Sequence, residues 1–145
     1  MSTKQIELYE IAKKEEGVHE WNPGSNPRIV EYASHTSLKA PDDSTAWCSS
    51  FVNWVCAQAK VKGTNSAAAR SWLTWGEEVL TPVVGDIVVL QRGASKSQGH
   101  VGFYEGKSAQ LNLGLVKVFA GNQGDSVCSQ WMQEAHVLGY RRIKV

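Results

Sequence analysis

The 145-residue sequence predicts an α+β domain in which N-terminal helices pack on a C-terminal antiparallel sheet. Up to about residue 75, apolar residues recur at helical spacing. After that point, short segments rich in β-branched and aromatic residues alternate with Gly-containing turns. Helices followed by strands are typical of this fold class. The length and the lack of an internal repeat or a linker predict a single domain over residues 1–145.

The first predicted helix begins after Ser2, which with Gln5 resembles a capping box, and runs to about Glu16. Gly17 ends it. The loop "WNPGSNP" follows by its Pro, Gly and Asn content, and Pro27 suits the first turn of a short helix, "PRIVEYASHT".

A third helix follows the loop "SLKAPDDST", which offers Asp43, Ser44 or Thr45 as its N-cap. Its predicted buried face is the helically spaced set Phe51, Val52, Val55, Cys56 and Ala59. A fourth helix, "SAAARSWLTW", is expected to end at Gly76.

Four predicted strands lie in the second half of the chain. They are "VVGDIVVLQRG", "GHVGFYEG", "LGLVKVFAGN" and "VLGYRRIKV".

The composition excludes several classes of protein. Apolar residues make up 42% and charged residues 20%, as in an ordinary globular domain, and the net charge of +1 indicates no nucleic-acid partner. The N-terminal segment is charged and lacks the apolar run of a signal peptide, and no apolar stretch approaches the roughly 20 residues of a membrane span. We therefore expect a monomer that is made in the cytoplasm without membrane insertion.

The three cysteines form no C-x-x-C pair, and their odd number leaves at least one free thiol. A disulfide framework is not expected in such a chain. His19, His35, His100 and His136 show no zinc-binding spacing, so we expect neither a metal nor a cofactor. A free thiol then serves as a nucleophile or fills the core.

Cys48 is the candidate nucleophile, because it lies near the start of a predicted helix, where a thiol pKa is lowered. His100 begins the strand "HVGFYEG" and would be the general base. Asn122, just past the next strand, would orient the imidazole. Strand alternation then turns the side chain of Gln123 away from His100 if Asn122 faces it. Gln123 is a further candidate for contact with the substrate.

Other candidates have a structural and a functional interpretation. Cys56 lies on the apolar helix face and is predicted to fill the core, while Cys128 is predicted to lie in a polar loop. Trp47 and Trp21 are core residues by default, but either could line a substrate cleft. Asp43 either begins a helix in solvent or recognises an amine of the substrate.

Five segments together resemble a known family. "AWCSSFVNWV", "PVVGDIVVLQ", "GHVGFYEG", "GNQGDSV" and "VLGYRR" occur in this order in small phage and bacterial CHAP-like peptidases, which are similar to NlpC-type cell-wall enzymes. The resemblance runs from about Ile6 to Arg142. It implies a papain-like fold and cleavage of an amide bond in the peptide part of peptidoglycan, with Cys48 as nucleophile, His100 as base and Asn122 as third member.

The sequence departs from better-known CHAP domains at two points. It lacks their acidic calcium loop, and Ala120 stands where many carry a glutamate. The leading hypothesis is a phage-type endolysin that acts on the wall in the periplasm. A type VI secreted amidase effector, a muropeptide-binding module without activity and an acyltransferase on the same scaffold are the alternatives.

Overall fold

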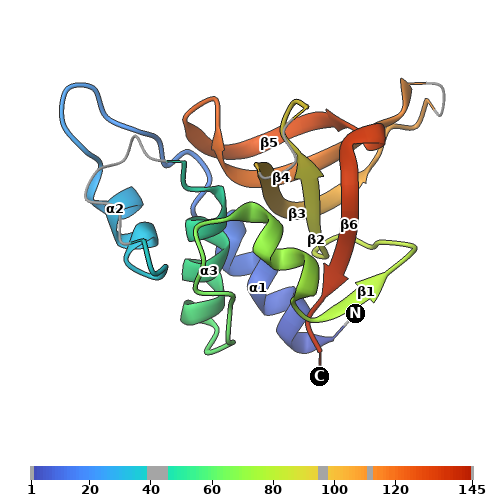
Figure 1. Cartoon of the computed structure of the whole chain (residues 1–145), viewed down its shortest axis with the longest axis horizontal. Coiled ribbons are helices and arrows are strands. Elements are labelled where there is room, and N and C mark those ends of the chain that lie inside the picture. Colours follow the sequence, from blue (N-terminus) through green and yellow to red (C-terminus); the bar gives the residue numbers. More distant parts are fainter. Residues whose placement is uncertain (1, 39–45, 95–97, 111–112, 145) are drawn as a thin grey trace.

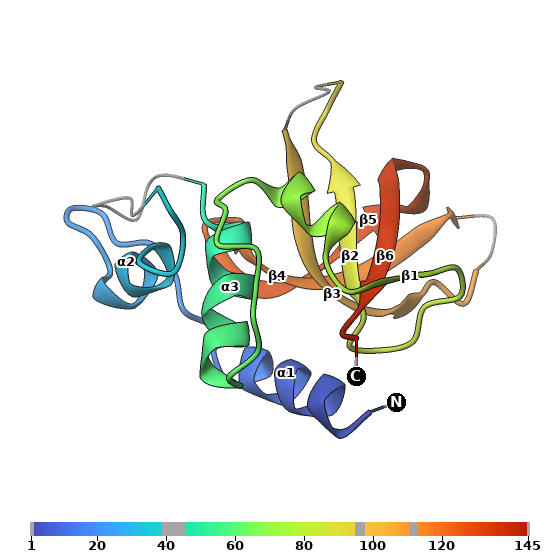
Figure 2. The same cartoon turned by 60° about the horizontal axis from the view of Figure 1, so that its bottom comes forward.

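A computed structural model describes residues 2–38, 46–94, 98–110 and 113–144. Three α-helices precede a six-stranded antiparallel sheet and gather on one side of it (Figures 1 and 2). The predicted α+β arrangement is confirmed, and it is consistent with a papain-like fold. No helix among these residues combines the length and the apolar character needed to cross a membrane.

The first two helices begin where their caps predict. Helix α1 spans Thr3–Lys13, and the Ser2 hydroxyl accepts a hydrogen bond from the backbone N–H of Gln5 at 3.2 Å. Helix α2 spans Pro27–Ala33, with the Asn26 side chain accepting from the backbone N–H of Arg28. Both helices end earlier than predicted.

Helix α3 spans Cys48–Gln58 and begins later than predicted. Its N-cap is Trp47, whose side chain makes no capping hydrogen bond, and the predicted caps at 43–45 lie outside the described residues. Every residue from Cys48 to Cys56 is buried, so α3 is the central helix. The predicted fourth helix is a shorter 3-10 helix, η1, at Ala69–Thr74.

The strands lie in the sheet in the order β1-β6-β2-β3-β4-β5, and all neighbours are antiparallel. Four of them match predicted segments: β2 (Ile87–Gln91), β3 (Gly99–Lys107), β4 (Leu115–Gln123) and β6 (Val137–Arg142). The two edge strands were not predicted: β1 (Glu77–Val79) and β5 (Ser126–Gln133).

The sheet is strongly curled. The chain passes from β5 to β6 through a three-residue 3-10 helix, η3 (Glu134–His136), although three strands lie between them in the sheet. The four residue steps from Gln133 to Val137 span at most about 14 Å, whereas four strand spacings of about 4.8 Å require roughly 19 Å in a flat sheet. The curl closes this distance and creates two cores.

The larger core lies between α3 and the sheet, where Phe51 packs on Phe119 of β4 at 6.4 Å between ring centroids. The smaller core lies on the other face, where residues of β2, β3 and β4 pack with Met132 of β5 and Tyr140 of β6. The candidate site lies where the N-terminal end of α3 packs against the start of β3.

Candidate active site

The structure brings Cys48 and His100 together. Cys48 is the first residue of α3 and His100 is the second residue of β3, and the two side chains lie close enough to shift each other's pKa. Both are almost fully buried, with exposed fractions of 4% and 5%. Helix packing on the strand thus joins two groups that are far apart in the sequence.

The environment of Cys48 favours the thiolate. Burial alone raises the pKa of the thiol, but the neighbouring His100 ring, the backbone N–H of Val101 and the charge of Arg92 together lower the pKa below its ordinary value. The start of an α-helix also stabilises a negative charge. Cys48 therefore has the properties of a nucleophile.

The environment of His100 favours the imidazolium. Burial lowers the pKa of the ring, but the Cys48 thiolate and the hydrogen bond with Gln123 raise the pKa above its ordinary value, against an opposing effect of Arg92. The two groups stabilise each other's charged forms, which is the ion pair that a cysteine peptidase uses.

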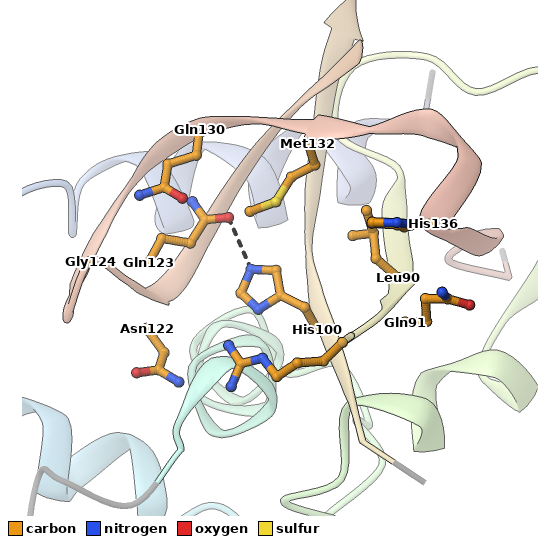
Figure 3. Close-up of a pocket in the computed structure, with 10 residues that line it drawn as sticks. Leu90, Gln91, His100, Asn122, Gln123, Gly124, Gln130, Met132 and His136 are labelled. Carbon is orange, nitrogen blue, oxygen red and sulfur yellow. Dashed lines mark hydrogen bonds between the residues drawn. The ribbon is translucent and has the colours of Figure 1, made fainter. Parts of the chain in front are cut away.

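Gln123 holds the His100 ring. Its Oε1 lies 2.9 Å from Nε2 of His100 (Figure 3). Its Nε2 donates to the backbone carbonyls of Cys128 at 2.6 Å and Val118 at 3.2 Å. Because both amide hydrogens are used on carbonyls, the amide oxygen must face the ring. The proton on Nε2 of His100 is therefore fixed, and Nδ1 is left for Cys48.

The Nδ1 atom of His100 is buried, and the ring and the Cys48 thiol shift each other's pKa. Among the described residues, Nδ1 has no hydrogen-bond partner of ordinary geometry. This is the geometry expected before a substrate tightens the site.

The prediction that Asn122 orients the His100 ring is wrong by one residue. Figure 3 shows the Gln123 amide reaching His100, while the side chain of Asn122 extends away from the ring. The cause is the backbone: Asn122 has a φ of 60°, and the β4–β5 register shifts between Ala120 and Gln123. The two side chains still point in different directions, but at this irregularity Gln123, and not Asn122, is turned toward the ring.

Trp47 is a core residue, so its predicted place in a substrate cleft is wrong. It is 1% exposed, stacks near Tyr32 at 5.9 Å, and donates from its indole nitrogen to Glu20 at 3.0 Å. The ring fits because residue 121 is glycine, where a Cβ would lie 2.5 Å from it. Trp47 thus fixes the start of α3 against β4.

The other predicted substrate contacts have different outcomes. Trp21 is 49% exposed but lines neither of the hollows described below. Asp43 lies outside the described residues. Gln123 is 3% exposed and engaged with His100.

The remaining cysteines are separate from the reacting pair. Cys56 is buried in the main core, as predicted, and burial raises its pKa to about 12. Cys128 lies on β5 and not in a loop, and its thiol donates to the backbone carbonyl of Gln123 at 3.3 Å.

Two hollows flank the pair. One, of about 240 Å³, lies beside Cys48 and is walled by small residues, Ala46, Ala67, Ala68 and Ala69. The other, of about 290 Å³, lies beside His100 and is lined by longer polar and apolar side chains, among them Asn122, Gln130, Met132 and His136 (Figure 3). Arg92 lines both hollows.

The contact of Gln123 with His100 and the position of Arg92 beside both hollows were not predicted from the sequence. A glutamine directly after "AGN" at the end of a strand was visible, but the irregular backbone was not. Arg92 directly follows β2, at the strand end next to His100. Within the described residues, no group of three or more His, Cys, Asp or Glu side chains could hold a metal ion.

Comparison with protein families gives one match. The sequence model of the CHAP domain family matches residues 40–122, a stretch that includes Cys48, His100 and Asn122 and ends one residue before Gln123. A search of curated proteins found no match.

Proposed function

The chain belongs to the CHAP domain family, and from this we propose that it hydrolyses an amide bond in the peptide part of bacterial peptidoglycan. Membership of the family supports a peptidoglycan hydrolase of the amidase or peptidase type. The observation that carries the proposal is the buried Cys48–His100 pair, in which the thiol pKa is lowered and the imidazole pKa is raised, beside two hollows.

In the proposed reaction, the Cys48 thiolate attacks the carbonyl carbon of the scissile amide. The negative charge moves to the carbonyl oxygen, close to the backbone N–H groups of the first turn of α3, which have no partners within the helix. His100 donates its Nδ1 proton to the leaving nitrogen, the C–N bond breaks, and a thioester to Cys48 remains.

Water completes the cycle. His100, now neutral at Nδ1, takes a proton from the water that attacks the thioester carbonyl. The C–S bond breaks, the carboxylic product leaves, and the thiolate–imidazolium pair is restored. Gln123 acts through His100 as a positioning residue, because its hydrogen bond keeps the proton on Nε2 throughout.

We also propose the setting: a phage-type endolysin that works on the wall in the periplasm. The resemblance of the five motifs to those of small phage and bacterial enzymes supports it. A secreted amidase effector would use the same chemistry. A neighbouring holin gene would support the endolysin, whereas neighbouring secretion and immunity genes would support the effector.

The decisive experiment is mass spectrometry of the muropeptides that the purified protein releases from Gram-negative sacculi. We expect new amino and carboxyl ends at one type of amide bond. The Cys48→Ala variant should release none while keeping its circular dichroism spectrum, because the covalent step is lost. Cys128→Ala should keep its activity, and unchanged cleavage by folded Cys48→Ala would disprove the cysteine mechanism.

Metal removal should have no effect on this activity. The reacting groups are a thiol, an imidazole and an amide, which need no metal to polarise them. We expect full activity in EDTA and complete inactivation by iodoacetamide, with Cys48 alkylated first. Loss of activity in EDTA that added calcium or zinc reverses would contradict this expectation.

A further inference from the structure

Arg92 occupies a distinctive position beside the reacting pair. It lines the hollow on the Cys48 side and the hollow on the His100 side, and its charge acts on both groups. It follows directly on β2, where Gln91 pairs with Gly99 and Leu90 pairs with His100. A regular strand pair therefore sets its distance from the site.

The guanidinium of Arg92 is available to a ligand. The residue is exposed, and no hydrogen bond or ion pair joins it to another described residue. Among the described residues that line the two hollows, Arg92 is the only arginine, and neither lysine nor a carboxylate is present. A substrate lying across the pair would meet one unpaired positive charge.

We infer that Arg92 binds a free carboxylate of the stem peptide on a residue flanking the scissile amide. A guanidinium presents a planar fork of N–H donors that matches a carboxylate with two parallel hydrogen bonds. Stem peptides carry such groups beside their amide bonds, as where a γ-linked D-Glu leaves its α-carboxylate free. This inference rests on the proposed function and adds the feature of the substrate that the site selects.

A purely electrostatic role for Arg92 makes a different prediction. The positive charge lowers the pKa values of both Cys48 and His100, so its removal should shift the pH profile upward for every substrate alike. Recognition of a carboxylate instead changes the preference between substrates. The two effects can therefore be separated in one experiment.

The experiment measures kcat/KM on three soluble cross-linked muropeptides, each at the pH optimum of the enzyme variant. One has all carboxylates free, one is amidated at the D-Glu α-carboxyl, and one is amidated at the free carboxyl of the diamino acid. We expect one of the amidations to lower kcat/KM of the unaltered enzyme about 10- to 100-fold, chiefly through KM, because a charged hydrogen bond is lost.

Variants of Arg92 and Lys62 test which residue distinguishes the free from the amidated peptides. Arg92→Gln should cleave the free and amidated peptides at similar, low kcat/KM, and Arg92→Lys should discriminate partly, since it keeps the charge but not the fork. Lys62→Gln is the matched control, because it removes one exposed positive charge that lines neither hollow, and it should behave as the unaltered enzyme.

Each outcome decides the matter. If the unaltered enzyme cleaves all three peptides alike, or if Arg92→Gln keeps the preference, the assignment of Arg92 is overturned while the hydrolase stands. If the folded enzyme cleaves none of the three and releases nothing from sacculi, the proposed function itself fails, and the assignment of Arg92 fails with it.

Discussion

At the scale of single residues, the choice of glutamine at position 123 explains how the imidazole is oriented. A carboxylate there would face the carbonyls of Val118 and Cys128 and repel both, whereas an amide donates to them and presents its oxygen to His100. The proximity of Cys48 and His100 could be predicted, because each lies at the start of an element with a local sequence signal. The residue that holds the ring could not, since the positive φ of Asn122 and the register shift beside it decide which of the two neighbours faces His100.

This assignment predicts how the pH profile responds to substitution. Activity should require the Cys48 thiolate and protonated His100, so kcat/KM should rise at a pH below the ordinary thiol range and fall above the ordinary imidazole range. Gln123 raises the pKa of His100, so Gln123→Leu should move the basic limb to lower pH and reduce kcat about 10- to 1000-fold.

Asn122→Ala is the matched comparison for Gln123→Leu. It should leave both limbs in place, because its side chain does not touch the ring (Figure 3). If the basic limb of the pH profile shifts in Asn122→Ala but not in Gln123→Leu, then Asn122 orients His100, as predicted from the sequence.

At the scale of elements, periodicity predicted the buried strands and not the edges. Strands β2, β3 and β4 carry continuous or alternating buried residues that give a clear signal. In β5 only Val127 is fully buried, and in β1 no residue is, so neither strand shows a period of two. Pairing with a neighbour, rather than their own composition, makes these segments strands.

The motif "WCSSFVNW" contains a structural group that periodicity does not show. Asn53 of α3 accepts hydrogen bonds from the backbone N–H groups of Thr64 and Asn65, each at 2.9 Å, and donates to the carbonyl of Ser66. Ser49 donates to the same carbonyl of Ser66 at 2.6 Å. These bonds hold the segment that leads into the alanine wall beside Cys48.

Substitution of Asn53 by alanine should therefore damage both stability and the site. Two backbone N–H groups lose their acceptor in a partly buried setting, and we expect the free energy of unfolding to fall by about 2–4 kcal/mol. Urea denaturation measures the loss, and KM for muropeptides should rise as the wall moves. Cys56→Ala, on the same helix, should cost about 1–2 kcal/mol with KM unchanged. If Asn53→Ala and Cys56→Ala change KM equally, then Asn53 does not hold the alanine wall in place.

At the scale of the whole molecule, Asp86 joins the two ends of the chain. Its buried carboxylate accepts two hydrogen bonds from the Arg142 guanidinium of β6, both at 2.7 Å, and one from the Gln5 amide of α1 at 2.8 Å. The backbone N–H of Val83 donates to it as well. The "GD" before β2, which the sequence marked only as part of a motif, thus fixes α1 and β6 around the curled sheet.

This pairing makes the stability of the fold depend on both partners together. Arg142→Met should lower the free energy of unfolding by about 3–5 kcal/mol, because it leaves the buried Asp86 carboxylate without its cation. Asp86→Asn should lower it by about 1–3 kcal/mol, because the Arg142 side chain that loses its partner is partly exposed. The double variant should lose clearly less than the sum of the two, since the second substitution removes the group that the first left unpaired. Urea denaturation of the four proteins gives this coupling directly, and Glu10→Gln, at an exposed position of α1, should stay within about 0.5 kcal/mol of the parent. Additive losses, or single losses below about 1 kcal/mol, would mean that the curl and the main core hold the termini in place without this ion pair.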